Sequence, residues 1–365
     1  MQNKSYNVKI YEPNGTYVTT VNESLRLSDI RFRSTMDAGQ GVLGLKIKSD
    51  FDSPPAWAAL NYFVKVFCVK LNGSNQTEQL LFTGLITRVE HEMQGSEEFM
   101  QLSVLGLSSL LGLALYKDGS NFNVVKSAVD PAVMAADVIS VANTAIGFTW
   151  LSTGGNVETV GTAVSYTFKK LRWLEALQKI KSFAGGNFFW FIGADGELHF
   201  KQIPATASHK FNILKNVNSI KVVNSAEEII NESTVEYTGG STKVSTDAAS
   251  VTAYFKRDEY QPADTDLDAN AAQQVADTQV TDNKEPKLQV SVEINSTFNI
   301  EGIKPGDTCK FFGTRTGSTV LGDNMVINSV EYNETTVKLT LVEDFGNFGT
   351  QLSKYLGNQL LDRQI

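Results

Sequence analysis

The three histidines of the chain are the first side chains to consider for metal binding or proton transfer. His91 lies near the exposed end of an expected strand, His199 lies on the outer face of an expected hairpin, and His209 lies in a polar loop. None is paired with another at the spacing of metal ligands. We therefore expect satisfied or solvated histidines and no metal site.

The nucleophiles and carboxylates also lack a catalytic pattern. No serine stands in a Gly-x-Ser-x-Gly elbow, which is the turn that exposes a catalytic serine. Gly239-Gly240-Ser241 follows an expected strand, but no helix-opening glycine fingerprint comes after it. The acidic pairs Glu97-Glu98 and Glu227-Glu228 lie in turns or at the ends of elements. Folding could bring two acids together, as glycosidases require, but the sequence does not show it. We expect no catalytic residue, no cofactor and no enzymatic activity.

The two cysteines, Cys68 and Cys309, are far apart and match no metal pattern. Cys68 continues the alternating run of Val64 and Val66, which indicates a buried structural thiol. The absence of a disulfide framework suits assembly in a reducing bacterial cytoplasm.

Size and charge narrow the class of protein. At 365 residues the chain is long for one compact core, so we expect two to four domains. The hydrophobic fraction of 42% and the charged fraction of 20% are ordinary for a soluble globular protein. A net charge of -8 argues against tight binding of duplex DNA or an anionic membrane, although DNA could still pass through without being held. We expect no membrane segment and no signal peptide.

A helix followed by a hairpin, over residues 171–203, is the strongest structural pattern in the chain. Apolar residues recur at helical spacing up to Ala184, and Gly185-Gly186 ends the helix. Phe188 to Ile192 is a continuous apolar run, and the turn Ala194-Asp195-Gly196 leads into the alternating strand that begins at Leu198. This pattern predicts a packing unit rather than a reactive site.

The segments on either side of this unit are rich in β-strand patterns. We expect a β-rich α+β fold with a first β-rich domain over 1–115, an α+β domain over 116–205 and a second β-rich domain over 206–348. Residues 349–365 carry leucines at helical spacing and predict a short C-terminal amphipathic helix. The acidic, alanine-rich stretch 262–283 is either a solvated helix over 269–278 or a mobile loop, and we favour the helix.

Three stretches in fixed order carry a resemblance to a known family. The first runs from Phe82-Thr83-Gly84 to Leu110-Leu111. The second runs from Trp173-Leu174-Glu175 through Gly185-Gly186 to His199-Phe200. The third runs from Ile303-Lys304-Pro305-Gly306-Asp307 to the strand pair that ends near Leu341. Together they resemble the baseplate hub and tail-associated proteins of tailed phages, the superfamily that includes late-control gene D proteins and the N-terminal part of siphophage tail-tip proteins.

The resemblance implies a structural virion protein at the tail tip or baseplate. In that family three copies form a ring, and each copy carries two similar tube-forming β-domains, of barrel or sandwich type, that can be built from discontinuous pieces. The implied partners are further copies of the chain, the tail tube or distal tail protein ring and the tape-measure protein. A tip or receptor-binding protein could dock through residues 349–365, and DNA would be a partner only in transit during ejection.

Three other functions remain open. A hexameric distal tail ring is the nearest structural alternative. A carbohydrate-binding adhesin at the tail tip would need exposed aromatic rings, for which Trp57, Trp150 and Trp190 are the candidates, although Trp190 lies in an apolar strand and is expected in the core. A tail endopeptidase or glycosidase is the enzymatic alternative, which an assay on cell wall would test.

Overall fold

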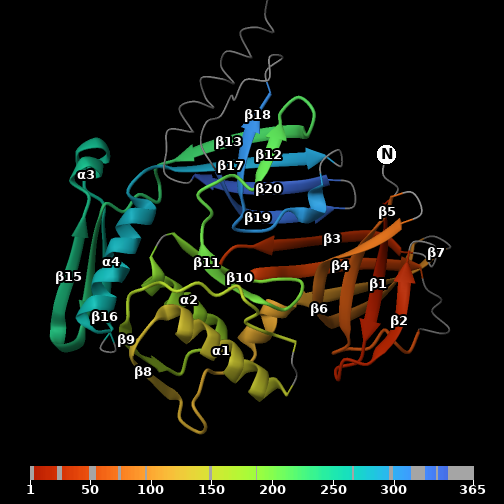
Figure 1. Ribbon diagram of the computed structural model, residues 1–365, viewed down its shortest axis with the longest axis horizontal. Helices are drawn as coiled ribbons and strands as arrows, with labels where there is room; N and C mark the ends of the chain where they lie inside the picture. Colours follow the sequence, from red (N-terminus) through yellow and green to blue (C-terminus); the bar gives the residue numbers. More distant parts are fainter. Residues whose placement is uncertain are drawn as a thin grey trace, which may run out of the picture.

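Figure 1 shows the computed structural model of the chain, which describes residues 4–22, 27–48, 55–72, 75–94, 97–147, 150–185, 187–264, 267–295, 299–313, 325–333 and 336–343. Within these residues a 13-stranded sheet is accompanied by smaller sheets of two, three and two strands. The molecule therefore has a β-rich α+β fold, as the sequence predicted. No helix in these ranges is long and apolar enough to cross a membrane.

The first part of the large sheet is built from the N-terminal strands, which are red and orange in Figure 1. In sheet order it reads β3-β4-β7-β6-β5-β1-β2, and every neighbouring pair is antiparallel. β1 and β2 form an antiparallel hairpin at the N-terminal edge of this part. The strands are β1 (Lys4–Tyr11), β2 (Tyr17–Asn22), β3 (Leu27–Thr35), β4 (Gly39–Lys48), β5 (Phe63–Asn72), β6 (Asn75–Gln94) and β7 (Glu97–Gly106).

The second part of the large sheet comes from the C-terminal half of the chain. Its sheet order is β13-β17-β20-β19-β18, again antiparallel throughout, and β12 pairs with β18 in parallel. The expected antiparallel pairing of the last two strands is confirmed, although part of their turn lies outside the described residues. The strands are β12 (His209–Asn212), β13 (Val217–Ser225), β17 (Lys287–Asn295), β18 (Thr308–Phe312), β19 (Met325–Asn333) and β20 (Thr336–Glu343).

The two parts repeat one topology. Strands β3, β4, β5, β6 and β7, here called the first β-unit, have the same chain order and sheet order as β13, β17, β18, β19 and β20, called the second β-unit. The irregularities coincide as well. The pairing of β6 with β7 shifts between Ile86 and Arg88, and that of β19 with β20 shifts between Ile327 and Ser329.

The approach to the third strand of each β-unit also repeats. In the first β-unit the backbone of Ile86 exchanges hydrogen bonds with Asn61 and Tyr62, and in the second the backbone of Ile327 does so with Gly306 and Asp307. Asn61 and Gly306 both have a left-handed backbone conformation, with φ of 69° and 81°. The chain therefore contains two copies of one five-stranded arrangement.

One hydrophobic core runs through both β-units. Alternate residues of the strands point into it, and it is continuous from Val8 and Leu45 to Val292 and Leu339. Cys68 and Cys309 both lie buried in this core and form no disulfide, which confirms the structural interpretation of Cys68. The continuity arises because β3 pairs directly with β19 and joins the two β-units into one sheet.

A second hydrophobic core is formed mainly by the α+β segment between residues 107 and 202. Asp130 caps α1 by accepting a hydrogen bond from the amide of Ala132, and Pro131 is the first helical residue, where proline needs no amide hydrogen. The all-apolar strand β10 is wholly buried, and Trp190 is fully buried as expected. The elements are the 3₁₀ segment η2 (Leu107–Gly112), β8 (Asn123–Val129), α1 (Pro131–Ile146), β9 (Val164–Lys169), α2 (Trp173–Ala184), β10 (Phe188–Ile192) and β11 (Leu198–Gln202).

The chain leaves the second β-unit between β13 and β17 and packs a further segment against this second core. The expected helix over 269–278 is confirmed and is longer, but it is not solvated on all sides, because Ala271, Ala272, Val275 and Ala276 are buried in the core that α2 also lines. The elements are β14 (Glu232–Tyr237), β15 (Ser241–Thr246), α3 (Ala248–Tyr254), β16 (Asp258–Asp264) and α4 (Ala269–Asn283), with 3₁₀ turns at Thr238–Gly240 and Ile300–Gly302. The C-terminal helix predicted over 349–365 lies outside the described residues.

Candidate functional site: the junction of the two β-units

The seam between β3 and β19 joins the two β-units within one chain. The paired residues are Thr35 with Ser329, Arg33 with Glu331 and Arg31 with Asn333. The Arg31 Nε donates a hydrogen bond of 3.0 Å to the Asn333 Oδ1. On the buried side of the seam, the rings of Phe32 and Tyr332 stack with centroids 5.0 Å apart. The seam thus combines backbone pairing, a polar outer face and an aromatic inner face.

A buried charge lies beneath this seam. The side chain of Glu301 is fully buried, and one of its oxygens lies 2.9 Å from the Nζ of Lys70 on β5. The other oxygen accepts a hydrogen bond of 3.3 Å from the hydroxyl of Tyr332 and a longer contact from the Cys68 thiol. The Tyr6 hydroxyl lies 3.3 Å from that of Tyr332. Burial, together with these neighbours, raises the pKa of Tyr332, so the phenol stays protonated. The network connects the first β-unit to the second.

A small cavity opens beside this network. Its volume is about 220 Å³, and its lining includes Gln40, Leu81, Phe191, Glu301 and Tyr332. It therefore lies where both β-units meet the β10–β11 hairpin. Pockets of about 300–1,000 Å³ are usual for small-molecule ligands, so the volume is modest. Its lining also includes Asp195 and Lys304, and its buried carboxylate, Glu301, is already paired with Lys70.

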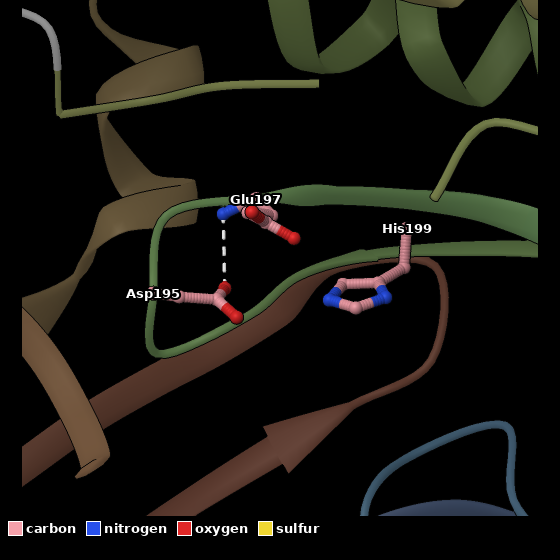
Figure 2. A group of neighbouring side chains, drawn as sticks. All are labelled: Asp195, Glu197 and His199. Carbon is pink, nitrogen blue, oxygen red and sulfur yellow. Dashed lines mark hydrogen bonds between the residues drawn. The ribbon is translucent and has the colours of Figure 1, made fainter. Parts of the chain in front are cut away.

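The turn of the β10–β11 hairpin brings together three possible metal ligands, Asp195, Glu197 and His199 (Figure 2), with one ligand atom from each lying within 4.8 Å of the others. The Asp195 Oδ1 accepts a 3.0 Å hydrogen bond from the Glu197 amide, and the Glu197 Oε2 accepts a 2.6 Å bond from Asn156. Both carboxylates are thus engaged in hydrogen bonds that hold the turn in shape.

His199 is buried, and its predicted place on a solvated outer face is wrong. Only 6% of the residue is exposed, its ring stacks on Phe191 with centroids 4.3 Å apart, and neither ring nitrogen has a hydrogen-bond partner among the described residues. Desolvation lowers the pKa of His199 to about 4, Asp195 opposes this shift and Lys201 adds to it. The alternating pattern predicted exposure of His199 because an alternating strand usually leaves one face solvated, whereas both faces of the β10–β11 hairpin are covered.

The predicted place of His209 in a polar loop is wrong, because His209 is the first residue of β12. His91 is on β6 at the surface, and the His209 Nε2 lies 2.9 Å from an oxygen of Asp307. The three tryptophans considered for a sugar site do not form an exposed platform. Trp190 is fully buried, Trp150 is half-buried and stacks on Phe63 at 4.1 Å, and Trp57 is half-buried against the core of the β-units.

The sequence interpretation did not identify which residues of the two β-units correspond to each other. Ile86-Thr87-Arg88-Val89-Glu90-His91 on β6 corresponds in the structure to Ile327-Asn328-Ser329-Val330-Glu331-Tyr332 on β19. The shared Ile-x-x-Val-Glu-aromatic pattern was a signal that a search for internal repeats could have found.

Comparison with solved structures finds tail proteins of phages and prophages. A tail protein from Neisseria meningitidis MC58 matches with a TM-score of 0.65 at 13% identity, over 94% of this chain and 97% of that protein. The 43 kDa tail protein of prophage MuSo2 from Shewanella oneidensis matches with a TM-score of 0.65 at 11% identity, over 93% and 98% of the two chains. The prophage tail protein gp18 from Listeria monocytogenes EGD-e gives a TM-score of 0.57 at 10% identity, over 96% and 99%.

A more distant match is a chain of the Francisella PdpA-VgrG complex, with a TM-score of 0.53 at 6% identity, over 94% of this chain and 53% of that one. No protein-family model matches the chain, and no curated protein matches it in sequence. The chain therefore has the fold of phage and prophage tail proteins. The resemblance that the sequence indicated is confirmed at the level of fold.

Proposed function

We propose that this chain is a structural protein of the tail tip or baseplate of a tailed phage or a phage-like injection machine. The solved tail proteins correspond to it over almost their whole length, and the shared fold spans more than nine tenths of this chain. The proposal places the protein in the virion tail, after assembly in the host bacterial cytoplasm.

The observation that carries a more specific role is the repeat of one five-stranded β-unit within the chain. A homotrimer of such a chain presents six similar β-units, which allows a threefold ring to bind a sixfold tail tube. We propose that the chain forms this trimeric hub at the end of the tube. Its partners would be the tail tube or distal tail protein, the tape-measure protein and a tip protein, the last docked through residues 349–365.

The proposed channel would let DNA pass rather than hold it. The chain carries a net charge of -8, and an acidic or neutral lumen repels phosphate. The proposed role is therefore mechanical, with no reaction catalysed by the chain. A ring lumen lined mainly by lysine and arginine would count against this part of the proposal.

The mass of the purified assembly in solution tests the trimer. Three chains of 40.0 kDa give about 120 kDa, which supports the hub. Six chains would support the hexameric distal tail ring instead, and a monomer at all concentrations would contradict both rings. An adhesin remains the second alternative, and glycan binding with loss on Trp57→Ala or Trp150→Ala would favour it.

A further inference from the structure

The β3–β19 pair has an equivalent pair of strands elsewhere in the two β-units. In the first β-unit the strand equivalent to β19 is β6, and in the second β-unit the strand equivalent to β3 is β13. Within the chain β3 of the first β-unit pairs with β19 of the second. The reciprocal pair, β13 with β6, is not made within the chain.

Both strands of this reciprocal pair present an edge along which no described strand lies. β13 pairs with β17 on one side and ends the large sheet on the other. β6 pairs with β7 from Gly84 to Gln94, but β5 covers only the part of β6 up to Leu85. The edge of β6 beyond Ile86 corresponds to the edge of β19 that β3 occupies. Long sheet edges of this kind are normally covered, because they otherwise invite uncontrolled pairing.

We propose that β13 of one copy pairs with the second half of β6 of the next copy, in the register of the β3–β19 seam. The inference deepens the proposed ring by naming the strands that close it. Arg88 is the first residue after the β6 irregularity, as Ser329 is after that of β19. The matched irregularities after Leu27 and Val217 likewise align Arg31 with Lys221.

The register follows from these equivalences. Asn333 lies opposite Arg31 within the chain, so Glu92 of one copy lies opposite Lys221 of the next. By the same step, Glu90 lies opposite Val223. The hydrogen bond between Arg31 and Asn333 would thus be replaced by an ion pair between Lys221 and Glu92, both of which are exposed in the single chain.

The surface chemistry of the two edges agrees with this pairing. The second half of β6 presents Glu90, which pairs with Arg88, and Glu92, which lies 3.6 Å from the Nζ of Lys46. The β13 edge presents the exposed cation Lys221, which would be a further partner for Glu92. Val223 is 42% exposed on β13, an unusual state for a β-branched residue in a strand, and pairing would cover it. Opposite charges facing each other across strands stabilise a pair, and the same arrangement sets its register.

Because β13 and β6 lie on different β-units, the contact is head-to-tail and alternates with the internal seam. First and second β-units then follow one another around the assembly. Such a heterologous contact closes into a ring when the rotation permits and makes an open chain when it does not. The occupant of the β13 edge is therefore a second copy of this chain.

Disulfide crosslinking between two single variants of the full chain tests this seam. Residues opposite each other in antiparallel strands have Cα atoms about 4.5–5.5 Å apart, which suits a disulfide. We expect Glu92→Cys mixed with Lys221→Cys to give a covalent dimer under mild oxidation, and neither variant alone to give one. The native Cys68 and Cys309 are buried and should not contribute.

The matched control mixes Glu92→Cys with Lys338→Cys, an exposed position on β20 between β17 and β19. That mixture should not crosslink above background. In a second measurement, Lys221→Glu should weaken assembly roughly two- to fivefold, and the exchange of both charges with Glu92→Lys should restore it.

The outcomes separate the seam from the ring. Crosslinking within a trimer supports both, and crosslinking in open chains supports the seam but contradicts the closed ring. A trimer that crosslinks no better than the control mixture overturns the seam and leaves the proposed function standing. A chain that neither assembles nor crosslinks at any concentration contradicts both.

Discussion

Glu301 is the charged side chain that the two β-units share, and its burial makes it sensitive to substitution. Glu301→Ala would remove the buried carboxylate that Lys70 and the Tyr332 hydroxyl share, and would leave Lys70 its hydrogen bond to Asn299 and Tyr332 its contact with Tyr6. Removing one partner of a buried ion pair costs about 3–5 kcal/mol of unfolding free energy. We expect urea unfolding of Glu301→Ala to show a loss of about 3 kcal/mol or more.

The matched control for Glu301 is the exposed pair between Lys48 and Glu97, whose nitrogen and oxygen lie 2.6 Å apart. Lys48→Ala should change the free energy of unfolding by at most about 1 kcal/mol. Equal losses in the two variants would contradict the role assigned to Glu301.

His199 should make the folded protein sensitive to mild acid. Its pKa is lowered to about 4 in the fold, whereas an unfolded histidine titrates near 6.5. Below pH 6.5 the unfolded chain therefore binds a proton at His199 that the folded chain does not. Protonation of His199 thus leaves the free energy of unfolding unchanged above pH 6.5 and lowers it as the pH falls towards 4. The lowered pKa of His199 corresponds to a loss of about 3 kcal/mol of unfolding free energy at most.

A His199→Phe variant keeps a ring against Phe191 and removes the titrating group. We expect the free energy of unfolding of the variant to fall less than that of the parent between pH 7 and pH 4.5, as measured by urea titration at each pH. Parallel pH profiles for the two proteins would show that His199 does not titrate in this way.

Among the elements, β6 depends on a glycine where it passes β7. A Cβ on Gly84 would lie 2.3 Å from the carbonyl oxygen of Leu105, so Gly84→Ala must displace the backbone of β7. We expect a loss of about 1–3 kcal/mol in unfolding free energy, the usual cost of overpacking. Gly44→Ala on β4 is the control, because nothing lies within 4 Å of its Cβ position. A Gly84→Ala protein as stable as Gly44→Ala would contradict the close approach.

The elements with strong local signals could be predicted from the sequence. The Asp130-Pro131 start of α1, the β10–β11 hairpin and the glycine of β6 all follow from the chemistry of a few neighbouring residues. β3 was missed because Arg31 and Arg33 alternate with only two large apolar residues. The parallel β12–β18 pair joins residues about a hundred positions apart, and no local pattern specifies such a contact.

The candidate site was harder to predict than the elements. The burial of His199 depends on a second layer covering the outer face of the hairpin, and the β3–β19 seam beside Glu301 depends on strands from both halves of the chain. The similarity of the two β-units was implied only by family resemblance, although Val89-Glu90 and Val330-Glu331 carried a trace of it in the sequence.

At the scale of the whole molecule, the repeat of one β-unit supports the proposal that three chains bind a sixfold tube. The internal seam fixes the step from the first β-unit to the second, and the proposed β13–β6 seam repeats that step between copies. The protein would then need only one kind of contact to build its ring, with the α+β segment placed outside this repeat.

An averaged electron-microscopy view of the purified assembly along its symmetry axis tests this account most directly. We predict a closed ring of three chains in which six similar lobes, alternating between first and second β-units, surround an open centre. A particle with one chain, or a ring in which the two β-units of a chain lie at unrelated positions, would contradict it.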